Sequence, residues 1–328
     1  MTGEAGVGGA ENRRPVKDRD SMIDILVVGS VALDDIDTPF GQARDALGGS
    51  AVYFSAAASA FASIGIVGVV GEDYPIERLE AFRARGVDLT GLEVREGTSF
   101  RWAGSYDYDL SSRETLLTEL GVFAEFQPSI PESFRRAPWV FLGNIDPRLQ
   151  LDVLRQVEDP RLVLCDTMNY WIEGNRSELL ELLEHVDMLL VNDAEARELS
   201  GDFNLARAAA WIRERGPDYV IIKKGEHGAI LFGPEEVFFV PGYPLEEIFD
   251  PTGAGDAFAG GLLGHLARAG RLDSEEMRRA VVFGCAMGSF ACEAFGPERL
   301  MDLRAAEVAD RVRSFHEMTR FESLAVPS

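Results

Sequence analysis

The chain has 328 residues, and its 55 Asp and Glu residues outnumber its 32 Lys and Arg residues, giving a formal net charge of −23 at pH 7. This balance argues against nucleic acid or an anionic membrane as a partner, because neutralising phosphates requires clustered Lys and Arg. An anionic ligand such as ATP would have to be held locally, by backbone dipoles, a metal ion or a few placed cations. The length allows two domains, or one large α/β domain with a small addition.

Cysteine usage favours a reducing cytoplasm as the location of the protein. Cys165, Cys285 and Cys292 form no C-x-x-C pair, and the four histidines are scattered. This pattern argues against a structural zinc site and against a secreted disulfide scaffold. Residues 1–21 are polar and Gly-rich and lack the apolar core of a signal peptide, so we expect a disordered tail before a domain that spans residues 22–328.

The first apolar run, residues 23–28, ends at Gly29-Ser30 and is typical of a buried strand. Residues 46–71 then carry no charge and are numerous enough to span a bilayer. However, residues 51–63 are Ala/Ser-rich and helical in character, whereas residues 64–70 are β-branched with glycines. We therefore interpret this segment as a helix that leads into a fully buried strand, and we expect no membrane span.

The middle of the chain alternates strand-like and helical patterns. This alternation predicts an α/β fold, with a mostly parallel sheet covered by helices on both faces and ligands bound at the carboxyl ends of the strands. Segments 34–47 and 97–126 break the pattern, and their partial alternation predicts strands that project as a small lid. The predicted strands are 139–142, 162–165, 188–191 and 219–222, and the predicted helices are 149–157, 177–185, 205–215, 257–269, 274–292 and 302–315.

The segment Asp250-Pro-Thr-Gly-Ala-Gly-Asp-Ala-Phe-Ala-Gly-Gly261 is the most informative in the chain. Its glycines can form a turn at the start of a helix, where free backbone N–H groups make an anion hole for a phosphate. Asp256 lies at the start of that helix and suits a general base that takes a proton from an attacking hydroxyl. The alternative is an N-capping Asp after a Gly-rich loop. Neither a Walker A loop nor a G-x-G-x-x-G fingerprint occurs, so phosphoryl transfer by another design is favoured.

Residues 250–261 resemble the C-terminal signature of the PfkB, or ribokinase-like, carbohydrate kinase family. Other stretches occur in the order that the family shows, and the resemblance covers nearly the whole chain from residue 23. It implies a three-layer α/β/α sandwich with a β-strand lid. The other matching stretches are Gly48-Gly49 before an Ala-rich helix, the strand and turn at 69–74, Asn192-Asp-Ala-Glu195 and Lys223-Lys-Gly-Glu-His-Gly228.

The resemblance implies a role for each matching residue on the nucleotide side. Asp256 would be the catalytic base, and the Gly253-Ala254-Gly255 backbone would stabilise charge on the transferred phosphoryl group. Asn192 and Glu195 would act near the phosphates, with Glu195 reaching Mg²⁺ through water, although both residues also fit an ordinary helix start. Lys223, Gly225, Gly228 and Thr252 would line the nucleotide, and Asp250 would accompany Thr252 at a site for a monovalent cation such as K⁺.

On the substrate side, Asp34 stands where sugar kinases of this family place a carboxylate on substrate hydroxyls, and Gly48-Gly49 resembles the substrate-side glycine pair of the family. The chain departs from the ribokinase pattern at Ala32 and Tyr53, where that pattern has amides. Tyr53 would instead offer an aromatic surface to a less polar ring. Asn144 and Asn169 are further polar groups at strand ends that could reach a substrate, and the aromatic residues of the lid would cover it or pack against a second subunit.

The expected function is therefore that of an ATP-dependent, Mg²⁺-requiring kinase acting on a hydroxyl of a small sugar or polyol. A nucleoside kinase of the same fold is the alternative, since the loss of two amides and the aromatic lid leave it open. A non-catalytic nucleotide-binding regulator is disfavoured by the intact Asp256 and glycine turn. The resemblance also leaves open a homodimer formed through the lids.

Overall fold

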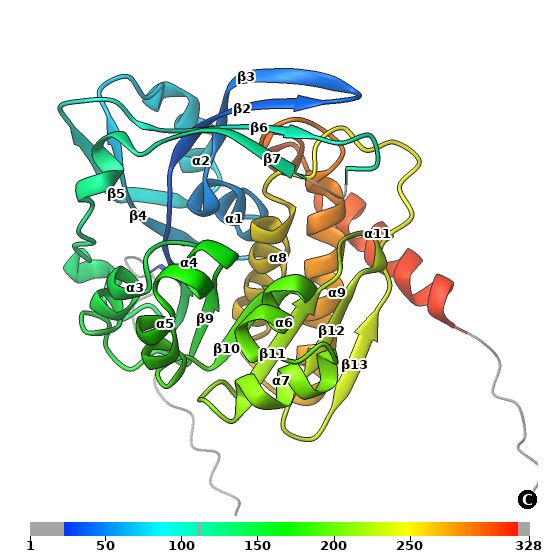
Figure 1. The fold of residues 1–328 in the computed structure, drawn as a ribbon. Helices are drawn as coiled ribbons and strands as arrows, with labels where there is room; N and C mark the ends of the chain where they lie inside the picture. Colours follow the sequence, from blue (N-terminus) through cyan, green and yellow to red (C-terminus); the bar gives the residue numbers. More distant parts are fainter. Residues whose placement is uncertain (1–22, 111–112, 321–328) are drawn as a thin grey trace, which may run out of the picture.

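The computed structural model describes residues 23–110 and 113–320, so the disordered tail expected at 1–21 lies outside the described residues. Its centre is a nine-stranded sheet (Figure 1). The six strands from β11 through β4 run parallel to one another, as does β5, whereas β12 and β13 are antiparallel additions at one edge. In spatial order the strands are β13 (Val237–Val240), β12 (Ala229–Phe232), β11 (Tyr219–Lys223), β10 (Met188–Asn192), β9 (Leu162–Asp166), β8 (Trp139–Leu142), β1 (Ile25–Val28), β4 (Ile64–Gly71) and β5 (Val87–Arg95).

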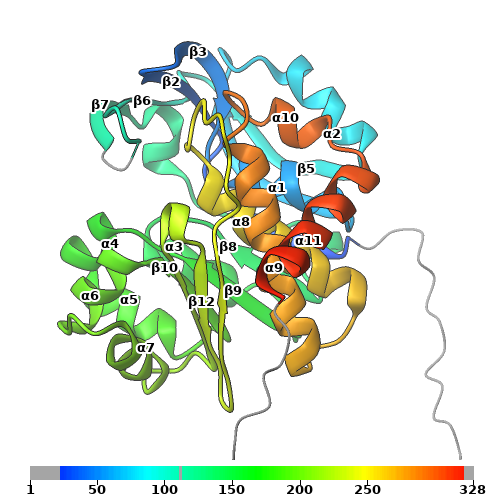
Figure 2. The ribbon, with the colours of Figure 1, turned by 90° about the vertical axis from the view of Figure 1, so that its right-hand side faces the viewer.

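Helices cover both faces of this sheet, which explains why its central strands are apolar throughout. Two separate hydrophobic cores result, one on each face. The two groups of helices lie on opposite sides of the sheet in Figure 2. One core is packed by α1 (Ser50–Ala58), α2 (Glu80–Ala84), α8 (Ala254–Ala269), α9 (Ser274–Ala291), α10 (Glu298–Met301) and α11 (Ala305–Thr319), and the other by α3 (Pro147–Leu154), α4 (Asn169–Gly174), α5 (Arg176–Leu183), α6 (Asp193–Ser200) and α7 (Leu205–Arg213).

A second, four-stranded sheet, called the small sheet below, lies above α1 in Figure 1. Its strand order is β3 (Gly41–Gly48), β2 (Ala32–Thr38), β6 (Phe100–Tyr106) and β7 (Arg113–Glu119). The segments expected to project as strands, 34–47 and 97–126, contribute these four strands. The outermost strand, β7, is exposed along its whole length.

The uncharged segment 46–71 divides into the end of β3, the helix α1 and the buried strand β4. No helix in the described part of the chain is long and apolar enough to cross a membrane. The sequence patterns did not predict β5, β12 or β13. Each of these strands lies at or next to an edge of the large sheet, and β13 is half-exposed, so a continuous apolar run does not mark it.

Candidate active site

The glycine turn before α8 has the geometry of an anion hole. Gly253 is the N-cap residue of α8 and adopts a left-handed conformation with φ of 73°, so the next N–H groups form the free end of the helix. A Cβ atom on Gly253 would lie 2.2 Å from the ring of Tyr53, which packs beneath the turn. The turn therefore needs glycine here for both conformation and space.

Asp256 is the third residue of α8 and makes no capping hydrogen bond. The alternative of an N-capping Asp is therefore wrong. Burial and the nearby Asp166 carboxylate together raise the pKa of Asp256 to about 7, against the opposing effect of the Lys223 ammonium. A carboxyl group with a pKa near neutrality matches the requirement for a general base at physiological pH.

Asp166 is a candidate site residue that the sequence did not single out. It ends β9, it is buried, and its two carboxylate oxygens each lie 3.3 Å from Lys223 Nζ at the end of β11. A Cβ atom on Gly255 would lie 3.1 Å from the same Nζ atom. Burial alone would lower the pKa of Lys223, but Asp166, Glu195 and Asp256 raise it overall, so the lysine stays charged. In the sequence, the signal for Asp166 is its position directly after the apolar run 162–165, where a predicted strand ends.

Asn192 and Glu195 form a complete capping box at the start of α6. Asn192 Oδ1 accepts from the Glu195 amide at 2.8 Å, and Glu195 Oε2 accepts from the Asn192 amide at 2.7 Å. The helix-start interpretation is thus confirmed for this pair. No hydrogen bond from the described residues reaches the other carboxylate oxygen, Glu195 Oε1, and burial raises the pKa of this group to about 7.

These groups fit a magnesium ion that is held mainly by phosphate oxygens and water. Mg²⁺ prefers oxygen ligands and usually retains several waters at phosphate sites. Glu195 Oε1 is a free carboxylate oxygen near the charged pair Lys223 and Asp166. Among the described residues, no group of three or more His, Cys, Asp or Glu side chains forms a complete metal cage. We expect Glu195 to reach the ion through water, because Mg²⁺ usually retains several waters at phosphate sites.

The remaining residues expected around the nucleotide are placed differently from one another. Gly225 begins a short 3-10 turn after β11 and is exposed, with nothing within 4 Å of a Cβ atom built on it. Gly228 is buried, and a Cβ atom there would lie 2.0 Å from the Val240 carbonyl oxygen. Close approach of two backbone segments is therefore sufficient to explain Gly228.

Asp250 is fully buried directly before the turn, with 0% of its surface exposed. Its Oδ1 atom accepts from the Thr252 amide at 2.8 Å. Among the described residues, Asp250 Oδ2 has no hydrogen-bond partner, and burial raises the pKa of the carboxyl group to about 6. An unpartnered buried carboxylate oxygen beside the anion hole fits a monovalent cation.

Asp34 lies in β2 of the small sheet and is also buried. A Cβ atom on Gly48 would lie 2.0 Å from Asp34 Oδ2, so this glycine provides the space for the carboxyl group. Burial raises the pKa of Asp34 to about 8, with further contributions from Asp250 and Asp256. The small sheet thus brings Asp34 to the side of the glycine turn, although more than 200 residues separate them in the chain.

The other residues expected on the substrate side do not all face a substrate. Tyr53 is only 1% exposed and its ring packs against Gly253, so contact between this ring and a substrate stays a prediction. Asn144 is already engaged, because Oδ1 accepts from Trp171 at 2.9 Å and Nδ2 donates to Met168 Sδ at 3.0 Å. Asn169 begins α4 and is exposed, and Gly49 is the N-cap residue of α1.

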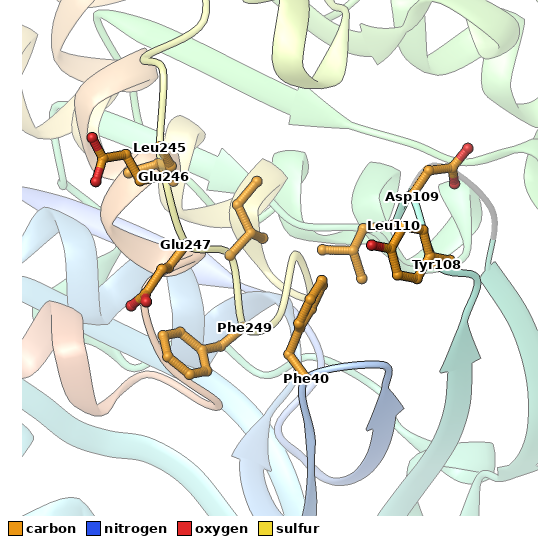
Figure 3. Close-up of a pocket in the computed structure, with 9 residues that line it drawn as sticks. Phe40, Tyr108, Asp109, Leu110, Leu245, Glu246, Glu247 and Phe249 are labelled. Carbon is orange, nitrogen blue, oxygen red and sulfur yellow. The ribbon is translucent and has the colours of Figure 1, made fainter.

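The small sheet contacts the segment that carries the turn. Thr38 Oγ1 donates to the Phe249 carbonyl at 2.9 Å, and the Tyr106 and Thr252 hydroxyl groups lie 2.9 Å apart. Beside these contacts a cavity of about 450 Å³ opens between the tips of the small sheet and the loop before Asp250 (Figure 3). Its lining includes Phe40 and Tyr108 on one side and the loop residues 245–249 on the other.

Comparison with known proteins places this chain in a family. The family described as pfkB family carbohydrate kinase matches residues 23–302. The chain is 31% identical to a cytidine kinase of Thermococcus kodakarensis, over 77% of this chain and 91% of that kinase. It is 30% identical to an aminoimidazole riboside kinase of Salmonella typhimurium, over 71% of this chain and 77% of that kinase.

Solved structures show the same fold. The aminoimidazole riboside kinase of Salmonella enterica, complexed with aminoimidazole riboside and an ATP analog, superposes with a TM-score of 0.71 at 25% identity, covering 89% of this chain and 99% of that one. The nucleoside kinase of Methanocaldococcus jannaschii gives a TM-score of 0.71 at 21% identity, covering 90% of this chain and 99% of that one. The ribokinase-like α/β fold expected from the sequence is confirmed. The chain belongs to the pfkB family of carbohydrate kinases and is a phosphotransferase that acts on a hydroxyl group.

Proposed function

We propose that this protein transfers the γ-phosphoryl group of ATP to a hydroxyl of a riboside, with a nucleoside as the preferred acceptor. The observation that carries this proposal is the pairing of Asp34 with Trp102, which are register partners on β2 and β6. Paired residues project from the same face of a sheet, so a carboxyl group and an indole lie side by side. A riboside offers the matching pair of groups, sugar hydroxyls and a flat ring.

The indole of Trp102 is held in a defined position. A Cβ atom on Gly104 would lie 2.1 Å from the indole, so the ring covers this glycine. The Arg113 guanidinium stacks at 5.3 Å from the ring centroid. A ring held in advance loses little conformational entropy when a base stacks on it.

The relatives support the same substrate class. The two matched over most of their length are named for cytidine and aminoimidazole riboside. A free sugar or polyol is the second candidate, because Asp34 by itself would bind hydroxyl groups, and a fructokinase of Oryza sativa is 32% identical over 36% of this chain. The sugar or polyol preferred from the sequence thus becomes the alternative.

In the proposed reaction, Asp256 removes the proton from the acceptor hydroxyl as its oxygen attacks the γ-phosphorus, and the bond from that phosphorus to the ADP oxygen breaks. The N–H groups after Gly253 stabilise the negative charge on the transferred group. Lys223 adds a positive charge next to Gly255. Mg²⁺, held by Glu195 through water, would neutralise phosphate charge when bound. The small sheet acts as the lid that excludes water.

Asp250 Oδ2 is buried and has no hydrogen-bond partner among the described residues, which supports a bound monovalent cation, K⁺ as the first candidate, next to the anion hole. We expect turnover in KCl to exceed turnover in tetramethylammonium chloride at equal ionic strength, because the larger ion does not fit a buried site. Asp250→Asn should abolish this difference. Equal rates in both salts would remove the cation from the proposal.

The substrate class is tested by coupled ADP release over nucleosides, free sugars and polyols with Mg²⁺ and ATP. We expect nucleosides to give the highest kcat/KM. Trp102→Leu should lower kcat/KM for a nucleoside far more than for any free sugar, since only the nucleoside has a base to stack. Trp211→Leu on α7, far from the small sheet in sequence and fold, is the control. Turnover with free sugars but with no nucleoside would refute the proposed riboside specificity. ATP binding with no turnover of any acceptor would favour a non-catalytic regulatory role.

A further inference from the structure

Two residues of the small sheet contact the segment that leads into the phosphate-binding turn. Thr38 ends β2 and Tyr106 ends β6, and the preceding residues Asp37 and Ser105 are register partners, so the two lie side by side. Thr38 donates to the Phe249 carbonyl, and Tyr106 meets the Thr252 hydroxyl, each at 2.9 Å. The two-point contact therefore spans residues 249–252, immediately before Gly253.

Two hydrogen bonds, one from Thr38 and one at Tyr106, join the ends of β2 and β6 to this segment beside a cavity. The tips of the small sheet stand apart from the loop before Asp250, across the cavity of about 450 Å³ in Figure 3. Phe40 and Tyr108 lie on one side of it and Phe249 on the other. Hydrogen bonds that border an open cavity can break and form again by local opening, without unfolding of the two hydrophobic cores.

Thr252 transmits this contact to the turn. Its amide donates to Asp250 Oδ1 at 2.8 Å, while its hydroxyl meets Tyr106. The next residue, Gly253, has φ of 73° and rests on Tyr53. Asp250 thus holds the Thr252 amide, and Tyr106 holds the Thr252 hydroxyl. The orientation of the peptide that precedes the anion hole depends on both contacts.

We infer that Tyr106 is a positioning residue that couples docking of the small sheet to the geometry of the phosphate-binding turn. Tyr106 touches neither the acceptor nor the reacting atoms in this role; it acts through Thr252. The turn reaches its productive geometry when the sheet is docked, so phosphoryl transfer is tied to a covered acceptor. The inference goes beyond the proposed riboside specificity and applies to any acceptor hydroxyl.

The first test is a double-mutant cycle with Tyr106→Phe and Thr252→Val, assayed with whichever acceptor gives turnover. Loss of one hydrogen bond predicts a fall in kcat of about tenfold for Tyr106→Phe, with the KM of the acceptor unchanged. The double variant should be no slower than the slower single variant, because both remove the same contact. Tyr108→Phe, which alters an 82% exposed hydroxyl at the same end of the sheet, is the control.

The second test needs no acceptor. Hydrogen–deuterium exchange of the free protein should show faster exchange in Tyr106→Phe than in wild type for the peptide that covers residues 252–257. The Tyr108→Phe control should match wild type. This arm separates the inference from the riboside proposal, since it can succeed where no nucleoside is phosphorylated.

Three outcomes would overturn the inference. A rise in the KM of the acceptor at constant kcat would make Tyr106 a substrate-binding residue. Additive losses in the double-mutant cycle would show that Tyr106 and Thr252 act independently. Unchanged exchange at residues 252–257 in Tyr106→Phe would show that the turn does not sense the small sheet.

Discussion

Asp256 is placed between a like charge and an opposite charge, and this arrangement sets its protonation. Asp166 raises the pKa of Asp256 and Lys223 lowers it, on top of the increase that burial causes. Asp166 and Lys223 also pair with each other at 3.3 Å. A substitution of Asp166 or Lys223 is therefore expected to change the pKa of Asp256 while Asp256 itself stays intact.

Asp256→Asn should retain ATP binding and lose most turnover, because the amide cannot accept the proton of the acceptor hydroxyl. A general base contributes about 10²- to 10⁴-fold, so we expect a fall in kcat in this range. Isothermal titration calorimetry measures the retained ATP affinity. Asp273→Asn makes the same substitution at the N-cap of α9, where Asn caps as well as Asp, and should leave kcat unchanged. Substantial residual kcat in Asp256→Asn would remove Asp256 from the role of base.

The pH profile of kcat/KM should have an acid limb near pH 7, because Asp256 must lose its proton and its pKa is about 7. Asp166→Asn removes the like charge and should move this limb to lower pH. Lys223→Gln removes the opposite charge and should move it to higher pH. Asp166 also raises the pKa of Glu195, and Lys223 also lowers it. We therefore expect the pKa of Glu195 to shift in the same direction as that of Asp256 in each variant. Shifts in the same direction for both variants would contradict this electrostatic account.

At the scale of elements, α8 has left-handed glycines at both ends, Gly253 with φ of 73° and Gly270 with φ of 65°. The two differ in their surroundings. A Cβ atom on Gly253 would collide with Tyr53, whereas nothing lies within 4 Å of one on Gly270. The N-terminal glycine thus has a steric requirement that the C-terminal glycine lacks.

Gly270→Ala should lower the free energy of unfolding by about 1 kcal/mol, the cost of placing a Cβ in this conformation, and leave turnover intact. Gly253→Ala bears the same cost and must also displace Tyr53, which distorts the anion hole. We expect its kcat/KM to fall by about a hundredfold, comparable to the loss of an oxyanion-hole donor. Urea unfolding and steady-state kinetics on the pair measure both effects. Similar activity in the two variants would show that the turn tolerates the displacement of Tyr53.

The central strands of the large sheet were predictable from the sequence, whereas the strands at its edges were not. Strands β8 to β11 were predicted within one residue at each end, because they are continuous apolar runs between polar segments. The helix at 257–269 was predicted three residues late, since its first turn is the glycine segment itself. β5 was not predicted, because it contains no continuous apolar run. It lies at the edge of the large sheet and is therefore only partly buried.

At the scale of the whole molecule, the net charge of −23 opposes the approach of an anionic nucleotide. In the proposed site, the attraction comes from the helix start and from Lys223, and the Arg113 charge also acts on Glu195. Raising the salt concentration from roughly 10 mM to 150 mM shortens the Debye length from about 30 Å to about 8 Å and screens the repulsion before it reaches the site. We therefore expect the association rate of a fluorescent ATP analogue with Mg²⁺ to rise several-fold across this range.

Stopped-flow fluorescence in tetramethylammonium chloride, at constant K⁺, measures this rate without changing the occupancy of the cation site. The usual behaviour of a cationic nucleotide-binding protein is the reverse, a decline with salt. A decline here would show that the local cations control the encounter in spite of the overall charge.

The sequence by itself determined the α/β fold, the glycine turn at the start of a helix and the position of Asp256 beside it. These features are local: they depend on apolar periodicity and on glycines within a few residues of one another. The contacts of Tyr53 and Asp166, which the sequence did not predict, join residues that are distant in the chain. Tyr53 packs under a turn 200 residues away, and Asp166 pairs with a lysine two strands along the sheet.

Only the tertiary structure decided these contacts, because the parallel strand order brings the ends of β9, β10 and β11 together at one edge of the sheet. It likewise placed Asp34 beside Trp102 and docked Tyr106 on Thr252, through the pairing of β2 with β6. Burial then set the protonation of Asp34, Asp256 and Glu195, which no local pattern encodes. The sequence determined which chemical groups are present, and the packing of distant segments decided their charge and their partners.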